Sequence, residues 1–333
     1  MIIKNYWILI TLAIFITILS SCASVEKKTE SRDTLNNEEI EKLKDEMAKL
    51  KELIKDEKQV RDEESDTRQD LQKEIDRLID ELAEGDIIQQ YRAGRKLKKI
   101  GKPAVPALIE AFKRDSRNLH MAAAIVLGEI KDESAVPVLL DELGRTKDKK
   151  LRAGLIVILG RIGDRRASPA LLEALNEDSE EVKGAAAYAL GRLKEDQAVS
   201  LLISLLNNQN EYIRKTVVKA LENIGEPTIS VLMNNMKNLP LNSRYLATKI
   251  LSSIGGENAI NALIQSMKDD NEYIRLSAAE ALSELGNNTG YELALKHLNN
   301  MKPEYQAVAK KALENLGRKV VWDEGKREFV VSE

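Results

Sequence analysis

Few side chains in this sequence are suited to covalent chemistry or to metal binding. The 333 residues include one cysteine, Cys22, and two histidines, His120 and His297. A single cysteine cannot form an intrachain disulfide, and two imidazoles are too few to hold a pair of iron ions. The sequence also lacks a Gly-x-Ser-x-Gly motif, a phosphate-binding loop and the ligand spacing of a zinc site. We therefore expect no enzymatic activity, no catalytic residue, no metal and no cofactor.

The surroundings of Cys22 point to lipid attachment. Lys4 precedes an apolar run from Tyr6 to Leu19, which is too short for an ordinary membrane span but has the length of a signal-peptide core. The run ends in Leu19-Ser20-Ser21-Cys22, which resembles the lipobox of bacterial lipoproteins. The resemblance implies a signal peptide over residues 1–21 and a mature N-terminus at Cys22 that carries acyl chains such as palmitate. An ordinary signal anchor is the alternative.

The same resemblance implies a location in the cell envelope. Stable anchoring in a membrane needs more than one acyl chain, and mature lipoproteins usually carry three. Ala23 follows the cysteine, instead of the aspartate that marks inner-membrane retention in many enterobacteria, so the resemblance implies an outer membrane if the organism has one. Residues 22–37 are polar with mixed charge, and we expect them to form a flexible tether.

Between the tether and the rest of the chain we expect one long helix over residues 38–84, a stretch without glycine or proline. Apolar residues recur there with 3,4 spacing, at Ile40, Leu43, Met47, Leu50 and Ile54 and again at Leu71, Ile75, Leu78 and Leu82. The same spacing places charged residues in the middle of this seam: Glu57, Arg61, Glu64 and Arg68. The pattern predicts a coiled coil with a polar centre, in which Glu–Arg pairing could fix the register of a homo-oligomer. A lone solvated helix that acts as a spacer is the alternative.

The stretch over residues 86–317 repeats one motif, Leu-x-x-[Ile/Leu]-[Gly/Lys], at intervals of about 31 residues. The motif begins at Leu97, Leu127, Leu159, Leu190, Leu221, Leu251, Leu282 and Leu313. Apolar residues before each leucine follow helical spacing, and the glycine that usually ends the motif suits a helix C-terminus. Lys131 and Lys194 replace that glycine and predict a less favourable cap. Asp86 is a suitable N-cap for a helix over Ile87 to Ile100, which we expect to cap the array as a half repeat.

The sequence blocks AVPVLLDEL, SPALLEAL, EEVKGAAAYALGRL and EYIRLSAAEALSELG resemble the short HEAT repeats of the phycobilisome-lyase type. The resemblance covers the repeats and implies an α-solenoid of stacked helix pairs, because one such pair cannot bury its apolar face alone. We therefore predict an all-α protein: a solenoid of HEAT-like helix pairs, preceded by a long coiled-coil-like helix and followed by a short β-hairpin. Repeats of this kind serve many unrelated functions.

One column of the second helices lies seven residues before each motif leucine and is mostly basic: Gln90, His120, Arg152, Lys183, Arg214, Arg244, Arg275 and Gln306. It could form a ladder that binds an acidic ligand. In HEAT-like families the corresponding residue more often bonds to carboxylates or carbonyls between repeats, and we favour that interpretation.

A second column lies two residues before each motif leucine and changes from apolar to charged: Arg95, Ile125, Val157, Tyr188, Lys219, Lys249, Glu280 and Lys311. We expect Gly128, Gly160 and Gly191, one turn further on, to leave the surface low. An apolar patch beside lysines suits a peptide or helix of a protein partner. The candidate binding residues are Met121, Ile125, Val157, Tyr188, Lys219 and Lys249, and additional core packing between repeats is the alternative.

The period changes in residues 318–333. Val320-Val321-Trp322 and the run from Arg327 to Val331 flank a turn and predict a β-hairpin. Because two strands alone are marginally stable, we expect Trp322 and Phe329 to lean on the last helices. The hairpin either caps the solenoid or offers a strand to a partner.

Composition limits the partners. The chain is 32% charged and 4% aromatic with a net charge of −3, and the excess of about 37 basic over 32 acidic residues from Ile87 onward is too small to indicate nucleic-acid binding. We predict a membrane-anchored lipoprotein that acts as a non-catalytic scaffold for an unknown protein partner. The alternatives are a structural spacer in the envelope and a lyase-type enzyme subunit or activator.

Overall fold

The computed structural model describes residues 37–299 and 302–332. The predicted signal peptide, the lipobox of Leu19, Ser20 and Ser21, the acylated Cys22 and the tether up to residue 36 lie outside the described residues. The chain divides into two units, Met1–Leu71 and Gln72–Glu333. Over the part of the chain that is described, no helix has both the length and the apolar character that crossing a membrane requires.

In the first unit, residues 37–71 form a single helix. They belong to α2 (Asn37–Glu84), which is 48 residues long and ends within the second unit. At 1.5 Å per residue, the stretch from 37 to 71 measures about 52 Å. Three of its apolar side chains are open to solvent: Leu53 is 61% exposed, Ile54 47% and Val60 54%. This part of α2 therefore has an apolar surface that its own chain does not bury.

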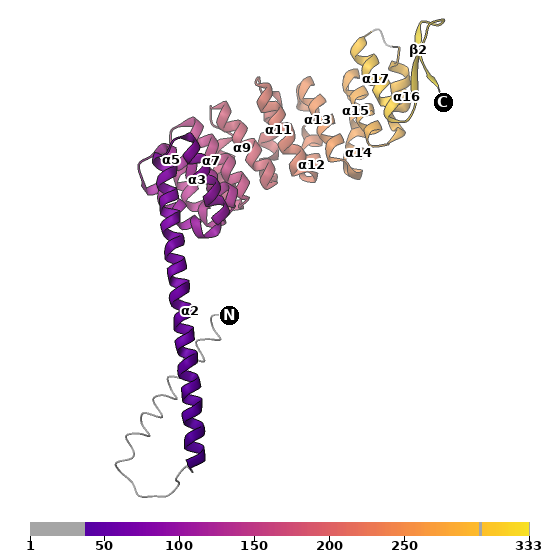
Figure 1. Ribbon diagram of the computed structural model, residues 1–333. Coiled ribbons are helices and arrows are strands. Elements are labelled where there is room, and N and C mark those ends of the chain that lie inside the picture. Colours follow the sequence, from indigo (N-terminus) through magenta and orange to yellow (C-terminus); the bar gives the residue numbers. More distant parts are fainter. Residues whose placement is uncertain (1–36, 300–301, 333) are drawn as a thin grey trace. The chain divides into compact units, whose positions relative to one another are not determined.

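The second unit is a row of helix pairs, in which a first helix is followed by a second helix (Figure 1). The first helices are α4 (Val105–Glu110), α6 (Val136–Arg145), α8 (Ser168–Ala174), α10 (Val199–Ser204), α12 (Glu226–Asn235), α14 (Gly256–Ser266) and α16 (Tyr291–His297). The second helices are α3 (Ile87–Ile100), α5 (Arg117–Ile130), α7 (Lys149–Ile162), α9 (Glu180–Leu193), α11 (Glu211–Ile224), α13 (Leu241–Ile254), α15 (Glu272–Glu284) and α17 (Pro303–Asn315). We call this second set the second-helix layer. The helical solenoid that the sequence predicts is confirmed.

Short 3-10 turns extend most of the first helices, though not α14, at one or both ends. They are η1 (Lys102–Ala104), η2 (Ala111–Lys113), η3 (Glu133–Ala135), η4 (Arg165–Ala167), η5 (Asp196–Ala198), η6 (Leu205–Asn207), η7 (Met236–Asn238) and η8 (Asn288–Gly290). Proline occupies the first turn of several of these helices, where no intrahelical acceptor exists for the missing N–H.

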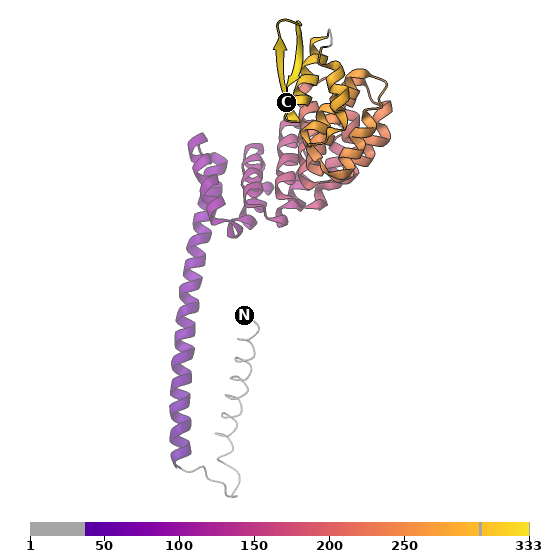
Figure 2. The same cartoon turned by 90° about the vertical axis from the view of Figure 1, so that its right-hand side faces the viewer.

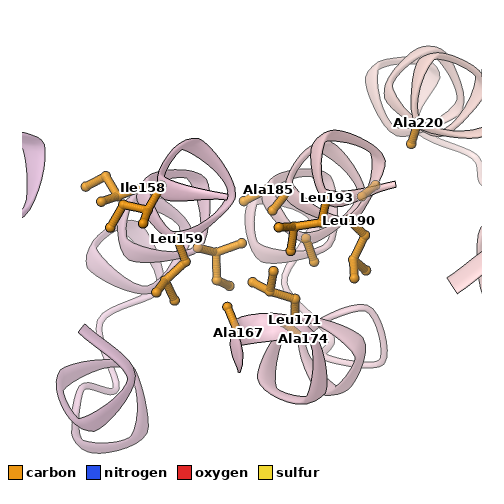
Figure 3. Packing of buried hydrophobic residues seen from close by; sticks show 14 of the residues in the cluster. Ile158, Leu159, Ala167, Leu171, Ala174, Ala185, Leu190, Leu193 and Ala220 are labelled. Carbon is orange, nitrogen blue, oxygen red and sulfur yellow. The ribbon is translucent and has the colours of Figure 1, made fainter. Parts of the chain in front are cut away.

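The motif leucine anchors each helix pair. All eight are 0% exposed: Leu97, Leu127, Leu159, Leu190, Leu221, Leu251, Leu282 and Leu313. Complete burial of one leucine side chain is worth about 2–3 kcal/mol, so this column alone supplies a large part of the packing energy. In Figure 3 Leu159 of α7, Leu171 of α8 and Leu190 of α9 turn toward the space between their helices.

The chain reverses after the second helices through left-handed or other positive-φ residues. Gly163, for example, has a φ of 90° directly after α7. Lys131 and Lys194 take the same place after α5 and α9 with φ of 59° and 50°. The predicted unfavourable caps are thus present, at about 1–2 kcal/mol of local strain each.

The last turns of α2 differ from the prediction of a free rod. Ile75, Leu78 and Leu82 are 1%, 0% and 2% exposed, and they share a core cluster with Leu97 of α3. Asp80 also pairs with Arg114 in the second unit at 2.7 Å. Residues 72–84 are therefore the first helix of a complete first pair, and the predicted half repeat is wrong. The 3,4 spacing suits either a coiled coil or a solenoid helix, and here the nearby core takes these side chains.

The chain ends in an antiparallel hairpin of β1 (Lys319–Asp323) and β2 (Glu328–Ser332) beside α16 and α17 (Figure 2). Val320 is 9% exposed and packs with Leu298 and Leu313. Asn299 donates to the Phe329 carbonyl at 2.8 Å and accepts from the Phe329 N–H at 2.7 Å. These contacts favour the capping role over the docking strand. Phe329 packs against the cluster of Leu298 and Leu313, as predicted, and Trp322, which is 52% exposed, stacks edge-on against Phe329.

Candidate functional site

The basic column of the second-helix layer is already bonded within the protein. Arg152 reaches Glu177 at 2.5 Å, and Arg244 reaches Asp269 at 2.8 Å. Arg275 donates to the main-chain carbonyl of Asp269 at 2.8 Å. Arg152 and Arg244 thus bond to carboxylates of the following repeat, as predicted, whereas Arg275 bonds to a main-chain carbonyl of its own repeat. The column therefore offers no ladder for an acidic ligand.

The two histidines also serve local packing. The Nδ1 of His120 lies 2.9 Å from the Glu142 carboxylate, and its Nε2 lies 2.7 Å from the Arg114 carbonyl. His297 is 3% exposed, and its Nε2 lies 3.2 Å from a carboxylate oxygen of Glu272. In residues 37–299 and 302–332, no group of three His, Cys, Asp or Glu side chains is placed to hold a metal ion.

The four apolar candidates for partner binding are exposed to different degrees. Ile125 is 45% exposed and Tyr188 is 37% exposed. Met121 and Val157 are half-buried and contact the core cluster. Arg192 lies over the Tyr188 ring, with its guanidinium carbon 5.9 Å from the ring centre. The open apolar surface in this column therefore rests on Ile125 and Tyr188, whereas Val157 fits the alternative of packing between repeats.

The glycines beside this column face the next helix instead of solvent, which corrects the prediction of a low open surface. A Cβ on Gly160 would lie 2.6 Å from the Cα of Ala189, and one on Gly191 would lie 2.5 Å from the Cα of Ala220. A Cβ on Gly128 would meet Ile158 at 2.9 Å. Each glycine thus lets the next second helix approach closely, from α5 to α11.

A groove opens where this glycine is absent, between α3 and α5. Lys98 occupies the corresponding position of α3, and its ammonium pairs with Glu129 of α5 at 3.1 Å. A lysine cannot be enclosed between two helices as a glycine can, because its charge must stay hydrated or paired. The result is a groove of about 920 Å³ with Leu82 and Val126 among its lining residues.

The walls of the groove are apolar and its rim is basic. Ile87 is 84% exposed, Tyr91 65% and Ile125 45%. Arg95 and Lys99 also line the groove, and the Arg95 guanidinium carbon lies 5.9 Å from the centre of the Tyr91 ring. Exposed aromatic and aliphatic side chains in a concave site are typical of helix-in-groove and peptide recognition.

The charged half of the column is occupied by its own partners. Glu280 is 4% exposed and receives Lys249 at 3.0 Å from α13 and Lys311 at 2.6 Å from α17. Glu284 receives Lys311 at 2.9 Å and the Ser252 hydroxyl at 2.8 Å. Lys249 is therefore a bridging cation of the fold, whereas Lys219 is 71% exposed in its side chain and pairs with Glu222 of its own helix.

The pKa values of this cluster follow from its contacts. Hydrogen bonds to Glu280 and Glu284 raise the pKa of Lys311, against the opposing effect of burial. Burial raises the pKa of Glu284, but hydrogen bonds from Lys311 and Ser252 and the charge of Lys249 outweigh it, so the pKa lies below its ordinary value. Both groups are thus held in their charged forms at neutral pH.

Sequence reasoning missed the groove residues Ile87, Tyr91 and Lys99. It treated α3 as an end cap, although α3 has five basic residues, no acidic one, and two isoleucines directly after its N-cap Asp86. That composition was a usable signal. The pairing of Glu280 with lysines from two neighbouring helices needs the three-dimensional stacking and had no comparable signal.

Comparisons with known proteins agree on the repeats. The profile of the family described as HEAT repeats matches residues 75–157, 119–191, 136–222, 168–241 and 229–317. No curated protein matches the chain.

Similar solved structures share low sequence identity with the chain. Human deoxyhypusine hydroxylase is 22% identical with a TM-score of 0.35, over 74% of this chain and 96% of that one. The complex of CpcE and CpcF of phycocyanin lyase from Nostoc sp. PCC7120 is 23% identical with a TM-score of 0.38, over 63% and 86%. Importin beta is 16% identical with a TM-score of 0.50, over 72% of this chain and 40% of that one. At such identity the likeness concerns the fold alone.

Proposed function

The chain belongs to the family of HEAT repeats, and from this premise we propose that it is a non-catalytic, protein-binding scaffold held at a membrane by a lipid on Cys22. A repeat fold does not specify a function, so the proposal rests on the site. The observation that carries it is the groove between α3 and α5, with Ile87, Tyr91 and Ile125 exposed beside Arg95 and Lys99.

The groove suits an apolar, acidic segment of a protein partner. Ile125 and Tyr91 expose apolar side-chain area to water, and a ligand that buries this area gains about 25 cal/mol of binding free energy per Å². Among the described residues, no ion pair is formed by Arg95 or Lys99, so both cations can receive carboxylates of a ligand. A helix or an extended peptide with apolar residues on one side and acids on the other satisfies both features.

Membrane attachment is supported by the sequence around Cys22 described above. The lipobox-like Leu19-Ser20-Ser21, the apolar run and the chain's single cysteine agree with one another. We propose a lipid-anchored protein of the cell envelope, in the outer membrane if the organism has one. The exposed part of α2 is then the place where copies of the chain associate, or a spacer if they do not.

We propose no enzymatic activity of its own for the chain. Lys249 and Lys311 pair with Glu280, the His120 ring lies within hydrogen-bond distance of Glu142, and the His297 ring lies 3.2 Å from Glu272. A role as a subunit or activator of a lyase-type enzyme and a role as an inert envelope spacer are the alternatives that the following experiment separates.

Crosslinking in the native envelope tests the binding face. A photo-reactive residue at position 125 should crosslink to one defined protein, and adding Ile87→Asp with Tyr91→Asp as a double variant to the same probe-bearing chain should reduce that product by about tenfold or more, because the two carboxylates would lie in the groove. Leu295→Asp is the control, since Leu295 is 39% exposed on α16 and outside the groove. A product that survives the double variant would refute the groove, and no product at all would favour the spacer.

Labelling tests the anchor independently of the groove. Cells that express the full chain and receive labelled fatty acid should incorporate the label into the protein. Cys22→Ala should abolish this incorporation and should move the protein from the detergent phase to the aqueous phase. An unlabelled wild-type chain would refute lipidation while leaving the binding face untouched.

A further inference from the structure

The C-terminal hairpin holds the solenoid with one face and with one of its two edges. Phe329 of β2 donates its N–H to the Asn299 side chain and accepts from the same amide with its carbonyl, so both of these main-chain groups point away from β1. Val320 of β1 is buried in a cluster with Leu298 and Leu313. The helix-packed face and the β2 edge are therefore occupied.

The edge along β1 is open. Trp322 lies opposite Phe329 in the register, so its N–H and carbonyl point out of the hairpin on the β1 side. Val320 lies two residues earlier and has the same main-chain direction, because this direction alternates along a strand. In the part of the chain that the structure describes, no hydrogen bond reaches these four main-chain groups. Such an edge can accept another strand.

The side chains of β1 also suit a contact. Trp322 is 52% exposed, although a tryptophan has a large apolar area to bury. Lys319 is exposed and has no ion-pair partner among the described residues. The Oδ1 of Asp323 accepts the N–H groups of Gly325 at 2.9 Å and Lys326 at 3.0 Å, which leaves its Oδ2 for a cation. One end of the strand is thus basic and the other acidic.

The sequence of β1 complements itself in the antiparallel direction. When two copies of β1 pair about Val321, Val320 lies opposite the second copy's Trp322, and Lys319 lies opposite the second copy's Asp323. Val320 and Trp322 then exchange main-chain hydrogen bonds, in agreement with the direction of their free groups. Two pairs join opposite charges, two join tryptophan to valine and one joins valine to valine, and pairs of these kinds stabilise a sheet.

Shifted registers lose this match. The free groups of Val320 and Trp322 permit only shifts that keep these residues in bonded positions. One such shift sets Lys319 opposite the second copy's Val321 and leaves Asp323 beyond the paired strand. The opposite shift sets Asp323 opposite the second copy's Val321. Either shift places a charge beside a valine without a partner of opposite sign.

We propose that two copies of the chain associate edge to edge through β1 and form a continuous four-stranded antiparallel sheet centred on Val321. The charge complementarity of Lys319 and Asp323 identifies the occupant of the edge as a second copy of the same strand. The contact goes beyond the proposed binding function, because it involves neither the groove between α3 and α5 nor the exposed part of α2.

The contact is weak on its own. β1 has five residues, so the pairing buries less area than the roughly 1,200 Å² of a stable protein interface. Copies that are held on one membrane meet at a higher effective concentration, at which a weak contact suffices. A covalent trap is therefore a better probe than sedimentation.

Cysteine crosslinking of the full chain tests the β1 edge. With Cys22→Ala the chain has no thiol, and Val321→Cys adds one at the centre of the contact. Directly opposite residues of neighbouring antiparallel strands lie within disulfide range. Val330→Cys is the matched control, because Val330 lies beside Val321 on the same face of the hairpin. In the four-stranded sheet the two copies of Val330 are three strand spacings apart, about 14 Å, which is beyond disulfide range.

Mild oxidation in detergent should give the Val321→Cys dimer in at least about tenfold excess over the Val330→Cys dimer, because only the former places its sulfurs opposite each other. Equal yields would show random collision and would overturn the proposal, as would an excess of the Val330→Cys dimer or the absence of any dimer. None of these results bears on the groove, whose partner is detected by the probe at position 125.

Charge exchange tests the register. Lys319→Asp, built into the Val321→Cys chain, sets aspartate against aspartate at both ends of the contact and should lower the dimer yield about tenfold, since two attractive pairs become repulsive. Lys326→Asp makes the same charge change in the turn, outside the paired strands, and should leave the yield unchanged. Equal yields from these two variants would overturn the register.

A mixture of two chains completes this test. When the Lys319→Asp chain is mixed with an Asp323→Lys chain, both carrying Val321→Cys, aspartate again faces lysine at both ends. The disulfide between the two chains should therefore return to about the yield of the parent Val321→Cys chain. A mixed disulfide as scarce as the Lys319→Asp dimer would contradict the pairing of positions 319 and 323.

Discussion

The second-helix layer is joined by two different chemistries along its length. From α5 to α11 the contacts are steric: Gly160 lies against Ala189 and Gly191 lies against Ala220 with no room for a Cβ. From α13 to α17 the contacts are ionic, with Glu280 held between lysines of the two neighbouring helices. The contact between neighbouring second helices can therefore be closed by removing a side chain in one part of the layer and by neutralising a buried charge in another.

The difference decides which part of the layer is open to a partner. Where lysines and glutamates pair with one another, their charges are already satisfied and have little to gain from a ligand. The apolar part has no such internal partner, and it is interrupted at α3 by Lys98, which keeps a groove open. A binding face is therefore expected at the beginning of the solenoid, away from the ionic end.

The largest expected effect is on the steric side. Gly160→Ala places a Cβ 2.6 Å from the Cα and Cβ of Ala189, so α7 and α9 must separate. We expect a loss of about 2 kcal/mol in the free energy of local unfolding, measured by native-state amide exchange of these helices. Gly144→Ala is the control, because a Cβ there meets nothing within 4 Å and should be neutral or slightly stabilising. Equal behaviour of the two variants would show that the glycine contact is not needed.

A smaller effect is expected on the ionic side. Glu280→Ala removes the buried carboxylate between Lys249 and Lys311, but the latter is half exposed and keeps Glu284. We expect a loss of about 1 kcal/mol at α15 and α17 by the same measurement, between the values for exposed and buried pairs. Glu222→Ala, whose partner Lys219 is exposed, should cost less than about 0.5 kcal/mol. Equal losses of unfolding free energy in Glu280→Ala and Glu222→Ala would mean that the burial of Glu280 does not strengthen its ion pairs.

The helical solenoid could be predicted from the sequence because each repeat contains the features that define its helix pair. The motif leucine, the glycine that follows it and the 3.6-residue spacing of apolar positions are all readable from one period. The period does not say where the array begins. The seam of Leu78 and Leu82 has the same spacing as that of Ile54, and only the position of α3 and α4 decides that the former is buried and the latter exposed.

The candidate site was predictable only in part. Ile125 and Tyr188 are open, as the second column predicts, because side-chain direction on a helix follows from spacing. Val157 is half-buried and Lys249 bridges to Glu280, and both outcomes depend on how far neighbouring helices are apart. That separation is set by pairs such as Gly160 and Ala189, which lie in different repeats and cannot be matched without a structure.

The smallest expected effect separates the two chemistries by pH. The pKa of Glu284 is lowered in the folded protein, so its contribution is present above the ordinary glutamate pKa of about 4.3 and disappears as the pH falls through the folded-state value. Lys311, whose pKa is raised, stays protonated throughout acidic and neutral pH and adds no dependence there. The stability difference between wild type and Glu284→Gln at α15 should therefore be at most about 0.5 kcal/mol at pH 7, because the carboxylate is partly exposed, and should be smaller at pH 3 than at pH 7. The penalty of Gly160→Ala should be the same at both pH values, since no ionisable group takes part in that contact. If the glycine penalty changed with pH by as much as the Glu284→Gln difference, the steric and ionic parts of the layer would not be independent.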